Sequence, residues 1–139
     1  MSKALALSQV LDASAIIAFL RDEPGASVVR QAIDGHAVVS AVNLSEVLSK
    51  MLDKGVSQDN AKLAVSALNL DVIDLDAAAG HDTAWLRTLT RHLGLSLGDR
   101  ACLALAKSIG AVVLTADRPW LSLCETLKQD IRCIRPDGH

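Results

Sequence analysis

The stretch LGDRACLALAKSIGAVVLTADR, residues 97–118, contains one helix followed at once by one strand. The sequence predicts a helix over 99–109 that Gly110 ends, because glycine is common directly after a helix. The valine-rich run 111–115 follows and is the most strand-like segment of the chain. Asp117 and Arg118 come where this strand ends. A helix that leads directly into a buried strand is typical of a parallel sheet covered by helices.

The same alternation of strands and helices continues along the whole chain. Strands are predicted near residues 7–12, 37–40, 72–75, 111–115 and 131–134. Helices are predicted near 13–21, 26–33, 43–53, 58–68, 77–93, 99–109 and 119–127. No repeat or linker divides the sequence, so we expect a single domain over residues 1–139. Its expected architecture is α/β, with a central parallel sheet of about five strands and helices on both faces.

The composition excludes several classes of protein. The chain has 139 residues, of which 50% are hydrophobic, so it can form a core without disulfides. Its formal net charge of −2 does not fit a strongly basic nucleic-acid scaffold. No apolar run approaches the roughly 18 residues that a membrane span needs, and the amino-terminal segment is a poor signal peptide. The three cysteines are widely spaced, so we expect free thiols in a cytoplasmic protein rather than a zinc site.

Four acidic residues lie near predicted helix starts: Asp12, Glu46, Asp99 and Asp117. Each can be explained locally, because an acid near a helix N-terminus caps backbone N–H groups and interacts with the helix dipole. Asp12 and Asp117, however, follow strands whose carboxyl ends should face one crevice, where such sheets bind their ligands. Four carboxylates in one crevice repel each other unless cations lie between them. Oxygen-only ligation suits Mg²⁺ or Mn²⁺, and a pair of such ions can promote phosphodiester cleavage.

Four segments resemble the motifs of PIN-domain proteins, in the order and at the ordinary spacing of that family. They are VLDASA at 10–15, SAVNLSEV at 40–47, LGDRACLALA at 97–106 and LTADR at 114–118. They are most similar to the bacterial VapC type, the toxin half of VapBC toxin–antitoxin pairs. The resemblance implies a Mg²⁺- or Mn²⁺-dependent endoribonuclease that cleaves RNA with metal-activated water and leaves 5′-phosphate and 3′-hydroxyl ends. It also implies a cognate VapB-like antitoxin as partner and a homodimer.

The resemblance assigns roles to individual positions of this sequence. The four acidic metal-binding and catalytic residues of the PIN-domain family correspond to Asp12, Glu46, Asp99 and Asp117. Asp12 and Asp99 are the expected principal ligands, whereas the other two acids bind the metal directly or through water. Three further residues match positions that line the same pocket: Ser14, Asn43 and Thr115.

Several other residues have two possible roles. Arg100 and Arg118 directly follow two of these four acids, and they are candidate RNA contacts or partners of those acids. Trp120 is expected to pack in the core rather than to stack on a base. The apolar residues of the predicted helix 43–53 are expected to face the core rather than a partner: Val47, Leu48 and Met51.

Three other functions were weighed against the nuclease. A catalytically idle RNA-binding or assembly module on the same fold remains an alternative, because a fold does not determine a function. A phospho-receiver domain fits poorly, since its first strand should end in an acidic pair and a lysine should follow a late strand. An aspartyl phosphatase fits poorly because Ser14 stands where its second acid is needed. The sequence does not identify the RNA that is cut.

Overall fold

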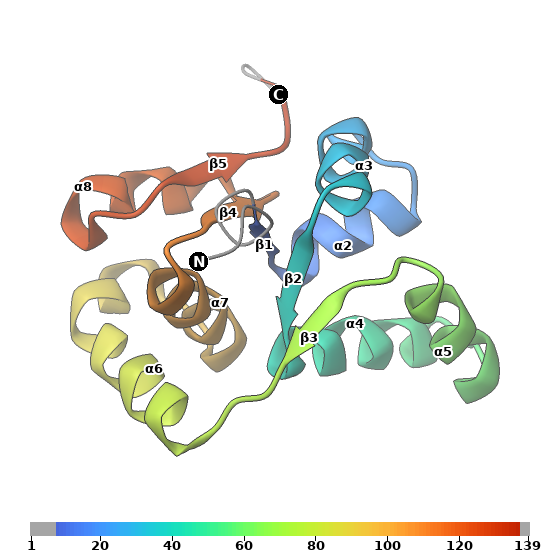
Figure 1. The fold of residues 1–139 in the computed structure, drawn as a ribbon, viewed down its shortest axis with the longest axis horizontal. Helices are drawn as coiled ribbons and strands as arrows, with labels where there is room; N and C mark the ends of the chain where they lie inside the picture. Colours follow the sequence, from blue (N-terminus) through green and yellow to red (C-terminus); the bar gives the residue numbers. More distant parts are fainter. Residues whose placement is uncertain (1–7, 137–139) are drawn as a thin grey trace.

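A five-stranded parallel sheet forms the centre of the molecule (Figure 1). The computed structural model describes residues 8–136, so the first residue of the first predicted strand, residue 7, lies outside the described residues. The strands are β1 (Gln9–Leu11), β2 (Ala37–Ser40), β3 (Asp71–Ile73), β4 (Val112–Thr115) and β5 (Ile131–Cys133). Their order is β3-β2-β1-β4-β5, and all four pairings are parallel. The predicted α/β architecture is confirmed.

The order of the strands reverses beside β1. The chain proceeds outward from β1 to β2 and β3, and then returns to the other side of β1 to form β4 and β5. The switch point of the sheet therefore lies between β1 and β4. In sheets of this kind, ligands bind at the switch point, beyond the carboxyl ends of the strands.

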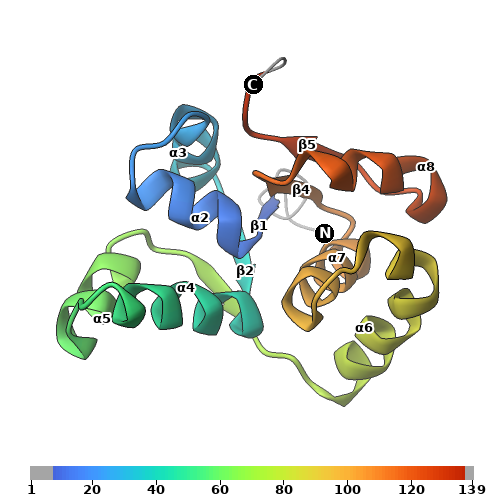
Figure 2. The same cartoon turned by 180° about the vertical axis from the view of Figure 1, so that it is seen from behind.

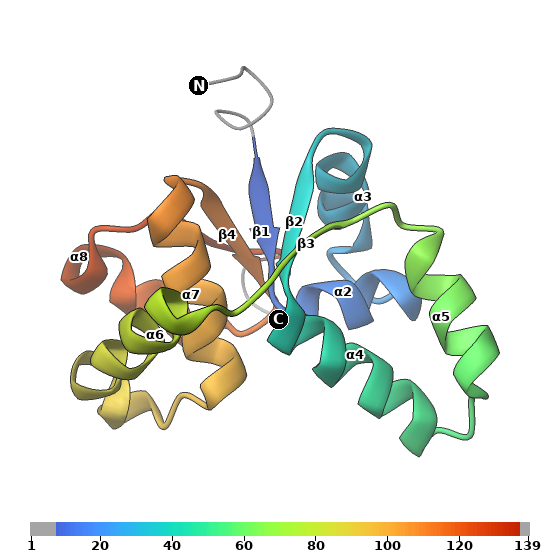
Figure 3. The same cartoon turned by 60° about the horizontal axis from the view of Figure 1, so that its bottom comes forward.

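Helices cover both faces of the sheet, as Figures 2 and 3 show from two directions. One layer contains α2 (Ala13–Leu20), α3 (Ala26–Asp34), α4 (Ala41–Asp53) and α5 (Gln58–Ser66). The other contains α6 (Ala77–Thr90), α7 (Leu97–Ile109) and α8 (Leu123–Leu127), with the 3₁₀ turns η1 (Arg91–Leu93) and η2 (Arg118–Ser122). Within residues 8–136, no helix has both the length and the apolar character that crossing a membrane requires.

Each face of the sheet packs against its own apolar core. Successive strand residues point to opposite faces, and both kinds are apolar because both faces are covered. The core beneath α6, α7 and α8 receives Val10, Val38 and Val113. The core beneath the other helices receives the next residue of each strand: Leu11, Val39 and Leu114.

The predicted elements are present, with shifted ends. Helix α4 begins at Ala41 rather than at 43, because the Ser40 hydroxyl accepts a hydrogen bond from the Val42 N–H and caps the helix. Glu46 consequently lies in the second turn, so its local explanation as an acid at the helix N-terminus is wrong. The helix predicted over 119–127 is divided into η2 and α8.

Predictions about core packing can be checked directly. Trp120 is 1% exposed, which confirms that it packs in the core and is inaccessible to a base. Val47 is fully buried. Leu48 and Met51 are partly buried and pack against the same core.

Candidate metal centre

Asp12 is buried at the switch point, directly after β1, with 3% of its surface exposed. Its Oδ1 accepts hydrogen bonds from the Ser14 hydroxyl at 2.7 Å and from the Ala15 N–H at 2.8 Å, so it caps α2. Its Oδ2 accepts a hydrogen bond from the Thr115 hydroxyl at 2.6 Å, at the end of β4. Both oxygens are therefore held in place, and the carboxylate joins the two strands that flank the switch point.

The surroundings of Asp12 oppose its negative charge. Burial raises the pKa of this carboxyl from 3.8 to about 6. The hydrogen bonds from Thr115, Ser14 and Ala15 lower the pKa in part, and the negative charge of Asp99 raises it further. A nearby cation would remove this penalty, because it favours the charged form of the carboxyl group.

Thr115 and Ser14 link Asp12 to the loop that follows β4. The Thr115 hydroxyl accepts a hydrogen bond from the Asp117 N–H at 3.1 Å, and the Ser14 hydroxyl accepts one from the Ala116 N–H at 2.9 Å. Asp117 is thus placed beside the switch point, with its side chain exposed. It occupies the N-cap position of η2, with Pro119 in the first turn as predicted, but its side chain makes no capping hydrogen bond.

Asp99 lies in the first turn of α7, and the Glu46 carboxylate lies against Gly98 in the same turn. Ser96 and Asp99 form the predicted capping box, in which the Asp99 Oδ2 accepts from the Ser96 N–H at 2.9 Å. The Asn43 side-chain amide donates to Glu46 Oε1 at 2.8 Å and to the Gly98 carbonyl at 3.0 Å. A Cβ at Gly98 would overlap the Glu46 carboxylate, so the absence of a side chain there gives this carboxylate its place. This role of Gly98 cannot be read from the sequence, although the residue lies within the motif at 97–106.

Three of the four predicted acids raise the pKa of one buried thiol. Cys102 is fully buried, and its pKa is raised well above the ordinary value, first by burial and then by Asp12, Asp99 and Glu46. These three carboxylates are therefore close enough to act on one group. Within residues 8–136, however, no group of three or more acidic, histidine or cysteine side chains lies close enough together to coordinate a metal ion. Each of Asp12, Asp99 and Glu46 is held in place by its own hydrogen bonds.

The two arginines that follow site acids have different positions. Arg100 is 7% exposed, and its Nη1 donates to the Thr83 carbonyl on α6 at 2.9 Å. The prediction that Arg100 contacts RNA is therefore wrong, since the side chain points into the α6–α7 contact. Arg118 is half-buried, and its Nη2 donates to the carbonyls of Arg135 and Pro136 at 2.8 and 3.1 Å. Its contact with RNA stays a prediction.

A comparison with protein-family models matches residues 10–125 to the PIN domain. The chain belongs to the PIN-domain family. The match covers the segments that contain Asp12, Glu46, Asp99 and Asp117. No curated protein sequence matches this PIN domain significantly.

Several solved structures share the fold of this PIN domain. One is a toxin–antitoxin complex from Klebsiella pneumoniae, with a TM-score of 0.72, 16% identity, and coverage of 91% of this chain and 98% of that chain. VapBC2 from Rickettsia felis, bound to a DNA fragment from the promoter, has a TM-score of 0.70 at 13% identity, with coverage of 91% and 98%. DNA-bound VapBC from Salmonella typhimurium has a TM-score of 0.68 at 20% identity, with coverage of 92% and 98%. At these identities the likeness establishes the fold.

The donor set of this PIN domain fits a hard divalent cation. Its oxygen donors are carboxylates, and the Asn43 Oδ1 is buried without a hydrogen-bond partner beside Glu46. The nearby sulfur of Cys102 is a poor ligand, because the raised pKa keeps the thiol protonated. Oxygen-rich sites of this kind suit Mg²⁺ and Mn²⁺ better than Zn²⁺.

Proposed function

We propose that this PIN domain is a Mg²⁺- or Mn²⁺-dependent endoribonuclease and the toxin of a VapBC-type pair. The observation that carries the proposal is the buried Asp12 carboxylate at the switch point of the sheet, where Ser14 and Thr115 hold it between β1 and β4. Acidic side chains near a buried carboxylate are suited to a divalent cation, and a cation there can attract a phosphodiester. The toxin role is supported by the fold shared with structures described as toxin–antitoxin complexes.

The four acidic residues of the centre have different roles in holding the ion. Asp12 and Asp99 are its principal ligands, and Glu46 and Asp117 bind it directly or through water. When bound, Mg²⁺ or Mn²⁺ would lower the pKa of a water molecule and offset the charge that develops on the phosphate. Water, rather than the ribose 2′-hydroxyl, is the nucleophile in this proposal, so the products have 5′-phosphate and 3′-hydroxyl ends.

Three neutral side chains orient these acids. Ser14 and Thr115 each donate to one oxygen of Asp12, which fixes the plane of its carboxylate. Asn43 donates to Glu46 and to the backbone of α7, which ties that acid to the helix of Asp99. Such preorganisation reduces the reorganisation needed during reaction.

The decisive experiment is RNA end sequencing after induced expression without antitoxin. Wild type is compared with Asp12→Asn, which keeps the size of the side chain but removes the charge. Asp53→Asn, at the exposed end of α4, is the matched control. We expect new 5′-phosphate ends in wild type and Asp53→Asn, and none in Asp12→Asn. Cyclic 2′,3′-phosphate products would contradict the mechanism, and identical ends in all three would favour a catalytically idle RNA-binding or assembly module.

We propose that the VapB-like antitoxin binds an apolar groove between α4 and α5. The groove has a volume of about 540 Å³, and Leu44, Leu48 and Leu52 of α4 face Ala61 and Val65 of α5 across it. Leu48 therefore packs against the core, as the sequence predicts, and also lines this groove, where contact with a partner is the alternative interpretation. Apolar helices of a partner typically dock in grooves of this kind.

The groove can be tested with two exposed leucines. Leu52 is 44% exposed and lines the groove, whereas Leu63 of α5 is 68% exposed and does not line it. We expect Leu52→Asp to weaken neutralisation by a co-expressed antitoxin, with RNA cleavage by the free toxin unchanged. Leu63→Asp should be neutralised like wild type. Equal neutralisation of both variants would place the antitoxin elsewhere.

A further inference from the structure

The segment 134–136, which follows β5, crosses the carboxyl edge of the sheet beside the candidate metal centre. The Ile134 N–H donates to the Thr115 carbonyl at 2.9 Å, and Thr115 in turn donates to Asp12. The Ile134 side chain is 4% exposed and packs in the core beneath α2–α5. A Cβ at Gly25 would overlap the Ile134 carbonyl, so this segment lies directly against the turn before α3. Its position is thus fixed by contacts on both sides of the switch point.

Arg118 holds this segment by its backbone. Its Nη2 donates to the carbonyl of Arg135 at 2.8 Å and to that of Pro136 at 3.1 Å. Because Asp117 precedes it in the chain, the contact ties the segment to the loop that carries an acid of the centre. The guanidinium of Arg118 is directed at these carbonyls, which makes it a positioning group.

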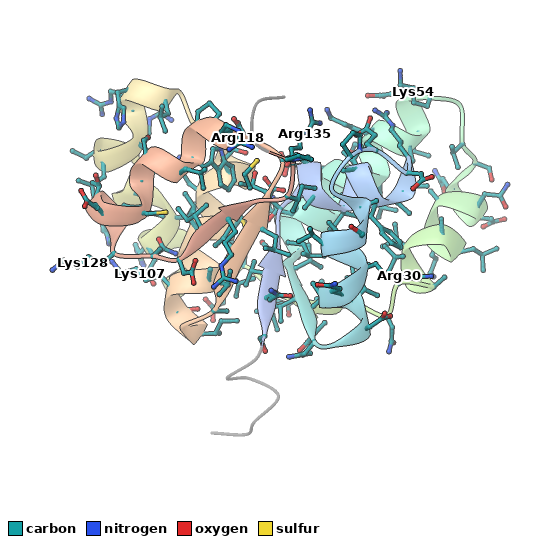
Figure 4. All side chains as sticks on the ribbon, turned by 90° about the horizontal axis from the view of Figure 1, so that it is seen from above. Arg30, Lys54, Lys107, Arg118, Lys128 and Arg135 are labelled. Atoms are coloured by element: carbon teal, nitrogen blue, oxygen red, sulfur yellow. The ribbon has the colours of Figure 1, made fainter. Side chains whose placement is uncertain are left out.

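The side chain of Arg135 is placed differently. It is 46% exposed, and its Nη2 lies 3.9 Å from Glu23 Oε1, at the outer limit of an ion pair. An exposed pair at this distance holds an arginine weakly. Figure 4 shows Arg118 and Arg135 next to each other at one edge of the molecule, whereas Lys107, Lys128 and Arg30 lie apart from them.

We propose that Arg135 binds the RNA backbone at the rim of the metal centre and that Arg118 positions it there. The inference rests on the proposed nuclease function. A chain of net charge −2 with acidic residues at its candidate metal centre repels RNA at long range, so a cation beside that centre offsets the repulsion where the phosphates enter. Arginine suits the task because its planar guanidinium can donate two hydrogen bonds to one phosphate.

The first test measures binding without cleavage. The probe is a fluorescein-labelled, mixed-sequence single-stranded RNA of about 20 nucleotides, enough to span several phosphate contacts. It is titrated in EDTA with fluorescence anisotropy as the readout. We expect Arg135→Ala to lower affinity about fivefold and to reduce the salt slope by about 0.7, the value for one phosphate contact. Arg135→Lys should restore the salt slope but only part of the affinity. Lysine keeps the positive charge but lacks the planar guanidinium that donates two hydrogen bonds to one phosphate.

Arg132 provides the matched control. It lies on β5, three residues before Arg135, is 61% exposed, and is bound to Asp130 by two hydrogen bonds. Arg132→Ala should bind RNA like wild type. If Arg132→Ala and Arg135→Ala have equal affinities, the proposal for Arg135 is overturned. The nuclease proposal is tested separately by the RNA ends of wild type and Asp12→Asn. A failure of the Arg135 proposal can therefore be distinguished from a failure of the nuclease proposal.

The role of Arg118 is tested by a double-mutant cycle. If Arg118 acts through Arg135, Arg118→Ala lowers RNA affinity, and adding Arg135→Ala causes little further loss. Additive losses would overturn the positioning role and show an independent contact. Cleavage kinetics supply a second readout, with the loss in Arg135→Ala expected mainly in KM rather than in kcat. Unfolding curves of each variant identify any loss that reflects the fold alone.

Discussion

Asp12 is a carboxyl group whose surroundings oppose its charge. Its pKa is raised from 3.8 to about 6, so near pH 5 the unfolded chain has mostly lost this proton while the folded chain keeps it. Folding therefore binds a proton in this window, and stability falls as the pH rises from about 4 to about 6. The shift of roughly two units corresponds to about 3 kcal/mol, which is fully lost above that window. A bound cation would return part of it.

Asp12→Asn should consequently stabilise the metal-free protein at pH 7.5 by about 1–3 kcal/mol, because it removes the buried charge. Its carbonyl oxygen can still accept from Ser14 and Ala15, and its amide can donate to the Thr115 oxygen. Urea unfolding in EDTA measures the difference, which should shrink towards zero at pH 4. A variant that is less stable than wild type at pH 7.5 would show that the hydrogen bonds outweigh the burial of charge.

Gly98 gives a second prediction for a single residue. A Cβ there would overlap the Glu46 carboxylate, which can swing away because it is the end of a flexible side chain. Gly98→Ala should therefore keep the fold but weaken Mn²⁺ binding and slow RNA cleavage by at least tenfold, about 1.4 kcal/mol in transition-state stabilisation. Gly80→Ala in α6 is the control, since a Cβ there meets nothing within 4 Å. Calorimetric Mn²⁺ titration that finds the same affinity in both variants would contradict the assigned role of Glu46.

The roles of single residues were only partly predictable from the sequence. The sequence places Asp12 and Thr115 at strand ends, and the parallel sheet then brings them together across the switch point. It suggested the wrong environment for Arg100, because consecutive helical residues point about 100° apart. Asp99 faces the centre while Arg100 faces α6. Arg135 could not be found at all, since its place depends on how the segment after β5 crosses the sheet.

The helices that carry the acids begin at capped positions, and this makes their starts testable. Ser96 caps α7 next to Asp99, and Ser57 caps α5 far from the acids in the chain. Ser96→Ala and Ser57→Ala should each cost about 1 kcal/mol of stability, the usual value of a lost N-cap. Only Ser96→Ala should also weaken Mn²⁺ binding, because the same capping box fixes Asp99. Thermal unfolding with and without Mn²⁺ separates the two effects.

The helices and strands themselves were predictable because the pattern of apolar residues and the residues that end helices indicate the same elements. Valine-rich strands alternate with helices that end at Gly35 and Gly110, and the structure has the same order. Shorter-range detail was harder to predict. Ser40 ends β2 and also caps α4, so strand and helix meet without a loop, and the start moved to Ala41. That shift places Glu46 one turn deeper, where Asn43 and Gly98 rather than the helix end determine its position.

At the scale of the whole molecule, one side of the sheet exposes apolar residues. Strand β3 is an edge strand, and its residue Ile73 is 37% exposed. On α6, Trp85 and Leu89 are 68% and 46% exposed. Asp82 lines two grooves, one together with Ile73 and the other together with Trp85. The apolar areas around Ile73 and Trp85 therefore adjoin. An unpaired edge beside exposed apolar side chains is a surface that proteins usually cover.

We expect a second copy of the chain to cover this surface, which would form the homodimer that the family resemblance implies. Trp85→Glu should convert the dimer to a monomer, because it buries a charge in the centre of the interface. Leu63→Glu is the control, since Leu63 is equally exposed at 68% but lies on α5 in the opposite helix layer. Light scattering coupled to size-exclusion chromatography measures the mass across a range of concentrations. A dimer that persists in Trp85→Glu but dissociates in Leu63→Glu would move the interface to α5, where it would compete with the antitoxin groove.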